Sequence, residues 1–289
     1  MQVAFPAKVL LFGEYTILNG SKALAIPYNA FNGKWSYENV DSDDRRISQE
    51  SLISFLQHGS EKYINLAALK ADVKKGLWFD SSIPHGYGVG SSGAFVAAIF
   101  NSYALKTGTP EDQKSLARLE DFFHGSSSGI DPYVSYIKKP LLIHSFDEIE
   151  VLEQKLDLKG FFLLDTGKAR QTAPLVKTYQ EKMKDPEFKK GCADVLSKDV
   201  NFAVNTLISD RENLFHHLWH ISKFQWESFP EMIPTQMRGI WSKGLDTGDY
   251  VLKLCGAGGG GFLLGFSEKY SFQEMQKILS EHELKSLVF

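Results

Sequence analysis

The chain has 289 residues, 43% of them hydrophobic, which is enough for a sizeable core in one or two domains. Its formal net charge of −3 argues against a broad basic surface for nucleic acid. The two cysteines form no pair pattern, no apolar run reaches the ~18 residues that cross a bilayer, and we expect no signal peptide. These features predict a cytoplasmic protein without nucleic acid or membrane partners. We expect it to be a monomer or a homodimer.

The first half of the chain is expected to mix short strands with helices. Strands are predicted at Lys8–Phe12, Ala23–Ile26, Lys34–Tyr37 and Leu77–Ile83, with turn residues Pro27, Asn29 and Gly33 between the second and the third. The polar stretch Glu38–Arg46 is expected to be a loop. Apolar residues at helical spacing predict helices at Tyr63–Lys74, Phe95–Tyr103 and Leu116–Phe123, the last ended by Gly125.

The second half is expected to be mainly helical, with a few buried strands. A strand is predicted at Gly160–Leu164, helices from Arg170 to about Trp226, and a closing helix at Phe272–Leu284. Val251–Leu254 and Gly261–Gly265 flank a second glycine-rich loop as a hairpin-like pair. Segregated strands and helices predict an α+β fold. The seam is expected around Ser145–Lys155, which divides the chain into domains at 1–150 and 151–289.

The stretch Pro84–Ala94 is the most informative part of the sequence. Its alternating glycines Gly86, Gly88 and Gly90 permit positive φ and leave backbone N–H groups uncovered. Ser91 or Ser92 is then expected to cap the helix that follows. Because a glycine loop that leads into a helix N-terminus offers N–H donors and the positive end of a dipole, this segment predicts a phosphate-binding loop.

Two common phosphate loops fit this stretch poorly. A P-loop needs a lysine after the glycines, and none is present. The dinucleotide pattern G-x-G-x-x-G is formally present at Gly88–Gly93, but Pro84 and His85 separate it from the preceding strand. A dinucleotide-binding oxidoreductase and a plain structural turn remain as alternatives.

The Pro84–Ala94 pattern resembles the second motif of the GHMP kinases, the family of galactokinase, homoserine kinase, mevalonate kinase and phosphomevalonate kinase. Pro6–Gly20 resembles that family's first motif, and Lys253–Phe262 resembles its third. The resemblance extends from Pro6 to about Phe266, and its motifs most resemble those of mevalonate kinases. It implies the two-domain GHMP kinase fold, with an N-terminal ATP-binding domain and the active site in the interdomain cleft.

The resemblance also implies ATP and Mg²⁺ as cofactors. The residues implied to bind the nucleotide come from the second and third motifs: Pro84, Gly86, Gly88, Gly90, Ser91, Ser92, Gly93, Ala94, Gly256, Ala257, Gly258 and Gly259. Ser92 and Glu120 are implied as magnesium ligands, in keeping with the preference of Mg²⁺ for a few hard oxygens. Without the resemblance, Glu120 would be taken for a solvated residue on a helix surface.

Asp131 is implied as the base that accepts the proton of the substrate hydroxyl. The segment from His124 to Asp131 resembles the His-Gly-x-x-Ser-Gly-Ile/Val-Asp segment of mevalonate kinases. On its own, Asp131 before Pro132 would indicate a turn. Lys8 begins a buried strand and therefore needs to reach solvent or a carboxylate. By the resemblance it pairs with Asp131 and stabilises the developing alkoxide.

The substrate is implied to be a small hydroxy acid, and the residues implied to contact it are Glu14, Tyr15, His124, Arg170 and Thr172. Mevalonate, phosphorylated to 5-phosphomevalonate in isoprenoid precursor synthesis, is the first expectation. Two departures from the mevalonate kinase pattern are Ala7 and Tyr15, and the Gly-Glu-Tyr sequence is more typical of phosphomevalonate kinases. A phosphomevalonate kinase, a sugar kinase and a non-catalytic binding protein with this fold are therefore the alternatives.

Two further features carry no functional prediction. Cys255 stands where the family more often has Ser or Thr, and it is interpreted as an inert buried thiol. His216, His217 and His220 include an i, i+4 pair as in zinc sites, but no HExxH pattern accompanies them. We interpret these histidines as ordinary packing or surface residues of a helix.

Overall fold

The computed structural model of this protein describes residues 3–58, 61–170, 172–280, 282 and 284–289. The chain forms two compact units, each assembled from segments that are far apart in the sequence. The first contains the described residues up to Val9 together with Ile26–Pro84 and Val89–Pro140. The second contains Leu10–Ala25, His85–Gly88 and Leu141–Phe289. The glycine stretch that begins at Gly86 is therefore divided between the two units.

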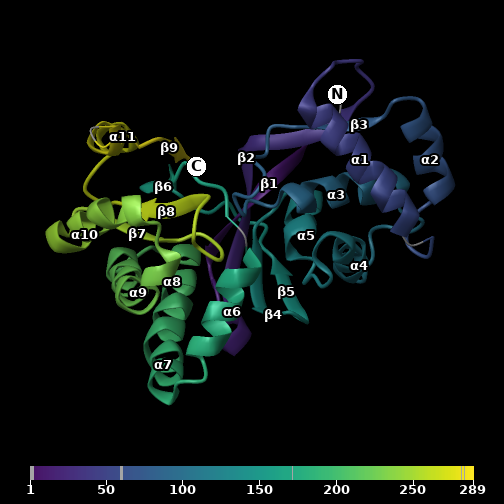
Figure 1. The fold of residues 1–289 in the computed structure, drawn as a ribbon. Coiled ribbons are helices and arrows are strands. Elements are labelled where there is room, and N and C mark those ends of the chain that lie inside the picture. Colours follow the sequence, from purple (N-terminus) through teal and green to yellow (C-terminus); the bar gives the residue numbers. More distant parts are fainter. Residues whose placement is uncertain (1–2, 59–60, 171, 281, 283) are drawn as a thin grey trace. The chain divides into compact units, whose positions relative to one another are not determined.

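The first unit is built around helix α3, which covers Ser91–Tyr103. Residues Gly93–Phe100 of α3 are all buried, as predicted for a helix that is apolar on most faces. Helices α4 and α5 pack against α3 and against each other (Figure 1). The other helices of this unit are α1 (Asp43–His58), α2 (Leu66–Lys74), α4 (Asp112–His124) and α5 (Ile130–Ile137).

Strands β1 (Phe5–Phe12) and β2 (Ala23–Ser36) contribute residues to both units. In the first unit the end of β2 pairs antiparallel with β3 (Trp78–Ser81), with Gly33 opposite Ser81. In the second unit the beginning of β2 pairs with β4 (Leu141–Ser145), which pairs in turn with β5 (Glu148–Val151). The strand order is β1-β2-β4-β5, with β3 also joined to β2.

The second unit holds a separate antiparallel sheet with the strand order β7-β8-β6-β9. Its strands are β6 (Phe161–Asp165), β7 (Val251–Leu254), β8 (Phe262–Phe266) and β9 (Ser286–Val288). The predicted hairpin-like pair is confirmed as β7 and β8. Helix α9 packs on β7 and on α8 (Figure 1). The helices here are α6 (Thr172–Lys182), α7 (Pro186–Gly191), α8 (Ser197–Ile208), α9 (Leu214–Ser228), α10 (Arg238–Thr247) and α11 (Phe272–Ser280).

Short helical segments complete the second unit. They are the 3-10 turns η1 (Thr16–Asn19), η3 (Pro230–Met232) and η4 (Thr235–Met237), and the π-helical turn η2 (Cys192–Leu196). The predicted helical region from Arg170 to Trp226 is confirmed by α6 to α9. No helix in the described part of the chain combines the length and the apolar character that crossing a membrane requires.

The prediction of two strands at Ala23–Ile26 and Lys34–Tyr37 is wrong, because both belong to the single 14-residue strand β2. Pro27 lies between the residues that pair with β4 and those that pair with β3, so its missing N–H does not interrupt either pairing. Gly33 is a packing position rather than a turn. A Cβ at Gly33 would stand 2.2 Å from the ring of Phe79, which covers this part of β2.

The predicted loop Glu38–Arg46 runs into helix α1, which starts at Asp43 and which the sequence analysis missed. The first turn of α1 is highly polar, and its apolar residues Leu52 and Phe55 are buried three positions apart on one face. Helix α5 was also missed. It begins one residue before Asp131, and Pro132 fits because the first turn of a helix needs no N–H donor there.

Candidate functional site

The glycine loop has the backbone that its sequence predicts. Gly86, Gly88 and Gly90 have φ of 74°, 71° and 76°. Helix α3 starts at Ser91 with Gly90 at the N-cap position, and no side chain caps it. The prediction that Ser91 or Ser92 caps the helix is therefore wrong. Because the chain enters the helix through a left-handed glycine, both serines already lie in its first turn, and their hydroxyls are not used as caps.

The end of this loop packs directly on Lys8 and Asp131. A Cβ at Gly90 would lie 3.3 Å from Cβ of Lys8 and 3.6 Å from Oδ2 of Asp131. A Cβ at Gly93 would lie 2.8 Å from the carbonyl carbon of Asp131. The backbone N–H of Lys8 donates to the carbonyl oxygen of Val89 at 2.8 Å. Gly90 and Gly93 thus allow α3 to approach β1 and α5 more closely than any other residue would.

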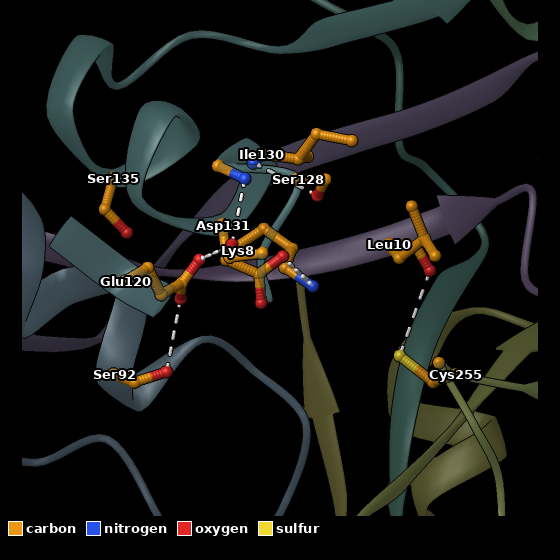
Figure 2. Close-up of polar contacts among 12 residues, drawn as sticks. Lys8, Leu10, Ser92, Glu120, Ser128, Ile130, Asp131, Ser135 and Cys255 are labelled. Carbon is orange, nitrogen blue, oxygen red and sulfur yellow. Dashed lines mark hydrogen bonds and ion pairs between the residues drawn. The ribbon is translucent and has the colours of Figure 1, made fainter. Parts of the chain in front are cut away.

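The predicted pairing of Lys8 with Asp131 is confirmed. The Lys8 ammonium lies 2.8 Å from Oδ1 of Asp131 (Figure 2). Lys8 is 6% exposed and Asp131 is partly exposed, so the carboxylate is the member of the pair that solvent or a ligand can reach. Asp131 is the second residue of α5, and the N-cap residue of this helix is the left-handed Gly129. A helix N-terminus stabilises a negative charge at this position.

Glu120 is buried and not a solvated surface residue. It lies in α4, is 3% exposed, and accepts a hydrogen bond of 3.3 Å from the hydroxyl of Ser92 (Figure 2). Its other oxygen accepts from the hydroxyl of Ser127. Burial and, after it, the nearby charge of Asp131 raise the pKa of Glu120 to about 7. The next residue, Asp121, pairs with the exposed Arg118 instead.

The oxygen donors around Glu120 fit the chemistry of a magnesium ion. Ser92 and Glu120 provide one hydroxyl and one carboxylate, and Mg²⁺ commonly takes one or two protein oxygens with the rest from phosphates and water. A buried carboxylate with a raised pKa is also one that a divalent cation would stabilise in its charged form. Among the described residues, no three His, Cys, Asp or Glu side chains are grouped as a complete metal site.

The second unit contains a buried ion pair that sequence reasoning missed. The Lys253 ammonium lies 2.6 Å from Oε1 of Glu14, and both side chains are 2% exposed. Lys253 also donates to the carbonyl oxygen of Leu254 at 2.7 Å. Burial raises the pKa of Glu14, and the Lys253 charge opposes that effect. The signal in the sequence was a lysine within the apolar strand Val251–Leu254, which requires a buried partner.

Tyr15, predicted to contact the substrate, is buried in the second unit. Its hydroxyl donates to the carbonyl oxygen of Ala257 at 2.7 Å. Its ring stacks on Tyr179 with centroids 4.5 Å apart. The phenol is thus bonded to the third glycine loop, while a substrate role of Tyr15 stays a prediction.

Arg170 lies between the two glycine-rich loops of the second unit. Its Nη1 donates to the carbonyl oxygen of Cys255 at 2.6 Å, and its backbone N–H donates to that of Gly86 at 2.9 Å. A Cβ at Gly88 or Gly256 would lie 1.7 Å or 2.4 Å from its Nη2. These glycines therefore make room for a guanidinium, which sequence reasoning had not anticipated. Its contact with a substrate carboxylate stays a prediction.

The remaining predicted site residues lie in several different elements. Thr172 is exposed at the start of α6, Pro84 is half-buried before the loop, and Ala94 is buried in α3. His124 ends α4, but its side chain lies outside the described part of the structure. In the third loop Gly256, Gly258 and Gly259 have φ of 71°, 75° and 75°. Their roles towards a ligand stay predictions.

Cys255 is a buried packing residue, whereas the three histidines are exposed or partly exposed residues of α9. Cys255 is buried, and its thiol lies 3.9 Å from the carbonyl oxygen of Leu10 (Figure 2). Nδ1 of His217 and Nδ1 of His220 lie 3.0 Å and 3.4 Å from the two oxygens of Asp199. His216 packs against His220 with ring centroids 4.2 Å apart.

Comparison with known proteins identifies the fold. Residues 54–139 match the family described as GHMP kinases N terminal domain. The mevalonate kinase of Thermococcus sibiricus is 27% identical over 310 residues, covering 92% of this chain and 89% of that protein. The solved Methanococcus jannaschii mevalonate kinase has a TM-score of 0.69 at 18% identity, covering 99% of this chain and 96% of its own.

A structure of Streptococcus pneumoniae phosphomevalonate kinase in complex with phosphomevalonate and AMPPNP is also similar. Its TM-score is 0.67 at 14% identity, and the match covers 100% of both chains. Identities this low show a shared fold and no more. The chain therefore has the GHMP kinase fold, matches that family's N-terminal domain at residues 54–139, and is similar to mevalonate kinases along nearly its whole length.

Proposed function

We propose that this protein is a kinase that transfers the γ-phosphoryl group of Mg-ATP to a hydroxyl of a small hydroxy acid. The observation that carries the proposal is the Lys8–Asp131 pair, held at 2.8 Å beneath the end of a glycine loop. Phosphoryl transfer needs positioning, charge neutralisation and a group to receive the proton of the attacking hydroxyl. The first unit offers residues suited to each of these tasks.

Asp131 is proposed as the group that accepts the hydroxyl proton, because it is the reachable carboxylate of the pair. The buried Lys8 ammonium would orient this carboxylate and stabilise negative charge that develops on the attacking oxygen. The first-turn N–H groups of α3 would bind phosphate oxygens, as helix N-termini do. Ser92 and Glu120 would hold Mg²⁺, which when bound neutralises charge on the phosphoryl oxygens.

Mevalonate is the proposed acceptor, and the reaction would form 5-phosphomevalonate in the cytoplasm as a step of the mevalonate pathway. This choice rests on the similarity to mevalonate kinases over 92% of the chain. Phosphomevalonate is the second candidate, favoured by Tyr15 in the first motif and by the similarity to a phosphomevalonate kinase structure. Glu14, Arg170 and Thr172 are proposed to contribute to acceptor binding.

The test is a coupled assay of ADP release with Mg-ATP and mevalonate, phosphomevalonate and sugars as separate acceptors. We expect turnover with mevalonate and little with the others. Asp131→Asn should lower kcat by about 10²–10⁴-fold, the range for a positioned general base. If Asp131→Asn stays within about tenfold of wild type, Asp131 is not the base. Absence of turnover with every acceptor, together with tight nucleotide binding, would favour a non-catalytic binding protein.

A further inference from the structure

The connection between helices α4 and α5, residues 125–129, is organised around the side chain of Ser127. Its hydroxyl oxygen accepts a hydrogen bond of 2.9 Å from the N–H of Gly129, the N-cap residue of α5. Because that N–H can only donate, the hydroxyl proton of Ser127 is left for its other partner, Oε2 of Glu120 in α4. The backbone N–H of Ser127 donates to Oδ1 of Asp121 at 2.7 Å. Ser127 therefore ties the end of α4 to the start of α5.

The same hydroxyl orients the Glu120 carboxylate. Oε2 of Glu120 accepts from Ser127, while Oε1 accepts a bond of 3.3 Å from the hydroxyl of Ser92 in α3 (Figure 2). The terminal torsion of a glutamate side chain has broad minima, so its own rotamer preference does not fix the direction of the two oxygens. The orientation of this buried carboxylate therefore depends on the hydroxyls that donate to it.

Ser92, Glu120 and Ser127 all belong to the first unit, in which α3, α4 and α5 pack against one another. Ser92 and Glu120 are the proposed ligands of Mg²⁺, and a hydroxyl that ligates a cation turns its oxygen towards the ion. When the Ser92 oxygen and Oε1 of Glu120 both face the ion, Ser127 is the donor that still holds Oε2. Carboxylates that ligate metals are commonly oriented by such hydrogen bonds. Ser127 is thus suited to orient a metal ligand without binding the metal itself.

We propose that Ser127 is a positioning residue for the divalent cation, whose hydroxyl holds Oε2 of Glu120 so that Oε1 faces the Ser92 hydroxyl. The inference rests on the proposed kinase function and refines it. Ser127 stands at an open position of the His-Gly-x-x-Ser-Gly-Ile/Val-Asp segment, so the resemblance assigns it no role. It touches neither the cation nor the reacting atoms. Loss of its hydroxyl therefore weakens cation binding and leaves the acceptor KM unchanged.

The test is Ser127→Ala, which removes the hydroxyl, with Mn²⁺ as the probe. Mn²⁺ prefers the same oxygen ligands as Mg²⁺, and its paramagnetism broadens the amide resonances near its site. Mn²⁺ is titrated into the nucleotide-free protein, and the Kd is read from the broadening of the Ser92 and Glu120 amides. We expect Ser127→Ala to raise this Kd by about 10–100-fold, the usual effect of losing a hydrogen bond to a metal ligand. Ser127→Thr keeps the hydroxyl and should bind Mn²⁺ as wild type does.

Ser135→Ala is the matched control. Ser135 is buried in α5, and its hydroxyl donates to the carbonyl oxygen of Pro6 at 2.7 Å. This variant loses a serine hydrogen bond of α5 while both donors to Glu120 remain, so its Kd should match that of wild type. An equal rise of the Kd in Ser127→Ala and Ser135→Ala overturns the proposal, because loosening of α5 would then be the cause. An unchanged Kd in Ser127→Ala, or a Kd just as high in Ser127→Thr, overturns it too.

Failure of the kinase function is seen separately from failure of this proposal. A wild type without turnover towards any acceptor contradicts the kinase function, while the Mn²⁺ titration still reports on Ser127. Turnover by wild type together with an unchanged Kd in Ser127→Ala leaves the kinase function in place and removes the role of Ser127. Absence of broadening at the Ser92 and Glu120 amides of wild type also overturns the proposal.

A second variant keeps the test decisive if Ser127→Ala does not fold. Ser127→Cys keeps nearly the same shape but replaces the hydroxyl by a thiol, which is a weak hydrogen-bond donor. We expect a rise of the Mn²⁺ Kd that is smaller than for Ser127→Ala. A Kd equal to that of wild type would show that donation to Glu120 does not support cation binding.

Discussion

At the scale of single residues, Lys8 places a buried ammonium beside the Asp131 carboxylate, which solvent or a ligand can still reach. Replacing it by methionine keeps the length of the stem against Gly90 and removes the charge. We expect Lys8→Met to lower kcat by at least about 10²-fold, the typical cost of removing one donor that stabilises developing negative charge. The Kd for Mg-ADP should stay within about threefold of wild type. Steady-state kinetics and calorimetry measure the two quantities.

Lys34→Met is the matched control for this substitution. Lys34 pairs with Asp80 at 4.0 Å, but both side chains are nearly half exposed, and such pairs contribute little. Its kcat should stay within about twofold of wild type. A Lys8→Met enzyme that turned over as fast as Lys34→Met would show that the Lys8 charge plays no part in the reaction.

Glu120 links the candidate magnesium site to the stability of the fold. Its pKa rises from an ordinary 4.5 to about 7 in the folded chain, mainly through burial. Between pH 4.5 and about pH 7 the folded chain retains a proton that the unfolded chain has lost. The free energy of unfolding therefore falls as the pH rises over this range. By the conversion of one pKa unit to 1.36 kcal/mol, the loss is about 3 kcal/mol without a divalent cation. Urea unfolding in EDTA at pH 5 and pH 8 measures it.

Glu120→Gln removes the titrating group and should flatten this dependence. We expect the variant to be more stable than wild type at pH 8 in EDTA and similar to it at pH 5. Glu227→Gln, at an exposed position beside Lys223, is the control and should follow wild type at both values. Equal losses in all three proteins would mean that Glu120 is not the group responsible.

At the scale of elements, the sequence predicted those helices and strands whose signals are local. Helix α3 follows from its apolar run, and the β7–β8 pair follows from two short apolar runs around a glycine loop. Strand β2 was divided wrongly because Gly33 looks like a turn residue until the ring of Phe79 is placed against it. Helix α1 was missed because its first turn is polar and its buried face appears only with its tertiary partners.

The distinction between local signals and long-range contacts also separates the predicted from the missed parts of the site. Lys8 and Asp131 could be paired because both lie in motifs that resemble those of mevalonate kinases, and because a lysine that enters a buried strand needs solvent or a carboxylate. The partners of Lys253, Tyr15 and Arg170 could not be predicted. They join positions separated by up to 242 residues, and nothing in either segment alone indicates the other.

Gly93 is expected to be required for the packing of α3 against α5. Alanine favours helices over glycine by about 0.5–1 kcal/mol, so a glycine inside a helix invites stabilisation. A Cβ at Gly93, however, would stand 2.8 Å from the backbone of Asp131. We therefore expect Gly93→Ala to reduce the free energy of unfolding by about 1–3 kcal/mol, as overpacking does, and to lower kcat. Urea unfolding and the coupled assay measure these changes.

Gly239 in α10 provides the opposite case. Nothing lies within 4 Å of a Cβ placed there, and the residue is exposed. Gly239→Ala should therefore raise the free energy of unfolding by up to about 1 kcal/mol and leave turnover unchanged. If both alanines stabilise the protein, the close approach at Gly93 is not a constraint on the fold.

At the scale of the whole molecule, neither compact unit is a continuous piece of chain. Residues 10–25 belong with the second unit, to which they supply Glu14 for Lys253 and Phe12 for the edge-to-face contact with Phe161. Ala23–Ala25 also provide the strand that pairs with β4. The predicted domain division at residue 150 remains a prediction. Composition along the chain could not reveal that residues 10–25 belong with the second unit, because that assignment depends on long-range contacts.

This arrangement predicts that the fragment 151–289 does not fold alone. It would keep the β7-β8-β6-β9 sheet but lose Glu14, leaving the 1%-exposed Lys253 buried without its counter-charge. Breaking such a pair by removing one partner costs about 3–5 kcal/mol, a large part of the stability of a small domain. We expect poorly dispersed amide resonances and no cooperative unfolding. Introducing Lys253→Met into the fragment should relieve the buried charge without restoring the fold, because Phe12 is still missing from beside Phe161. Well-dispersed resonances from the unmodified fragment would contradict the prediction and show that residues 151–289 form an independent domain.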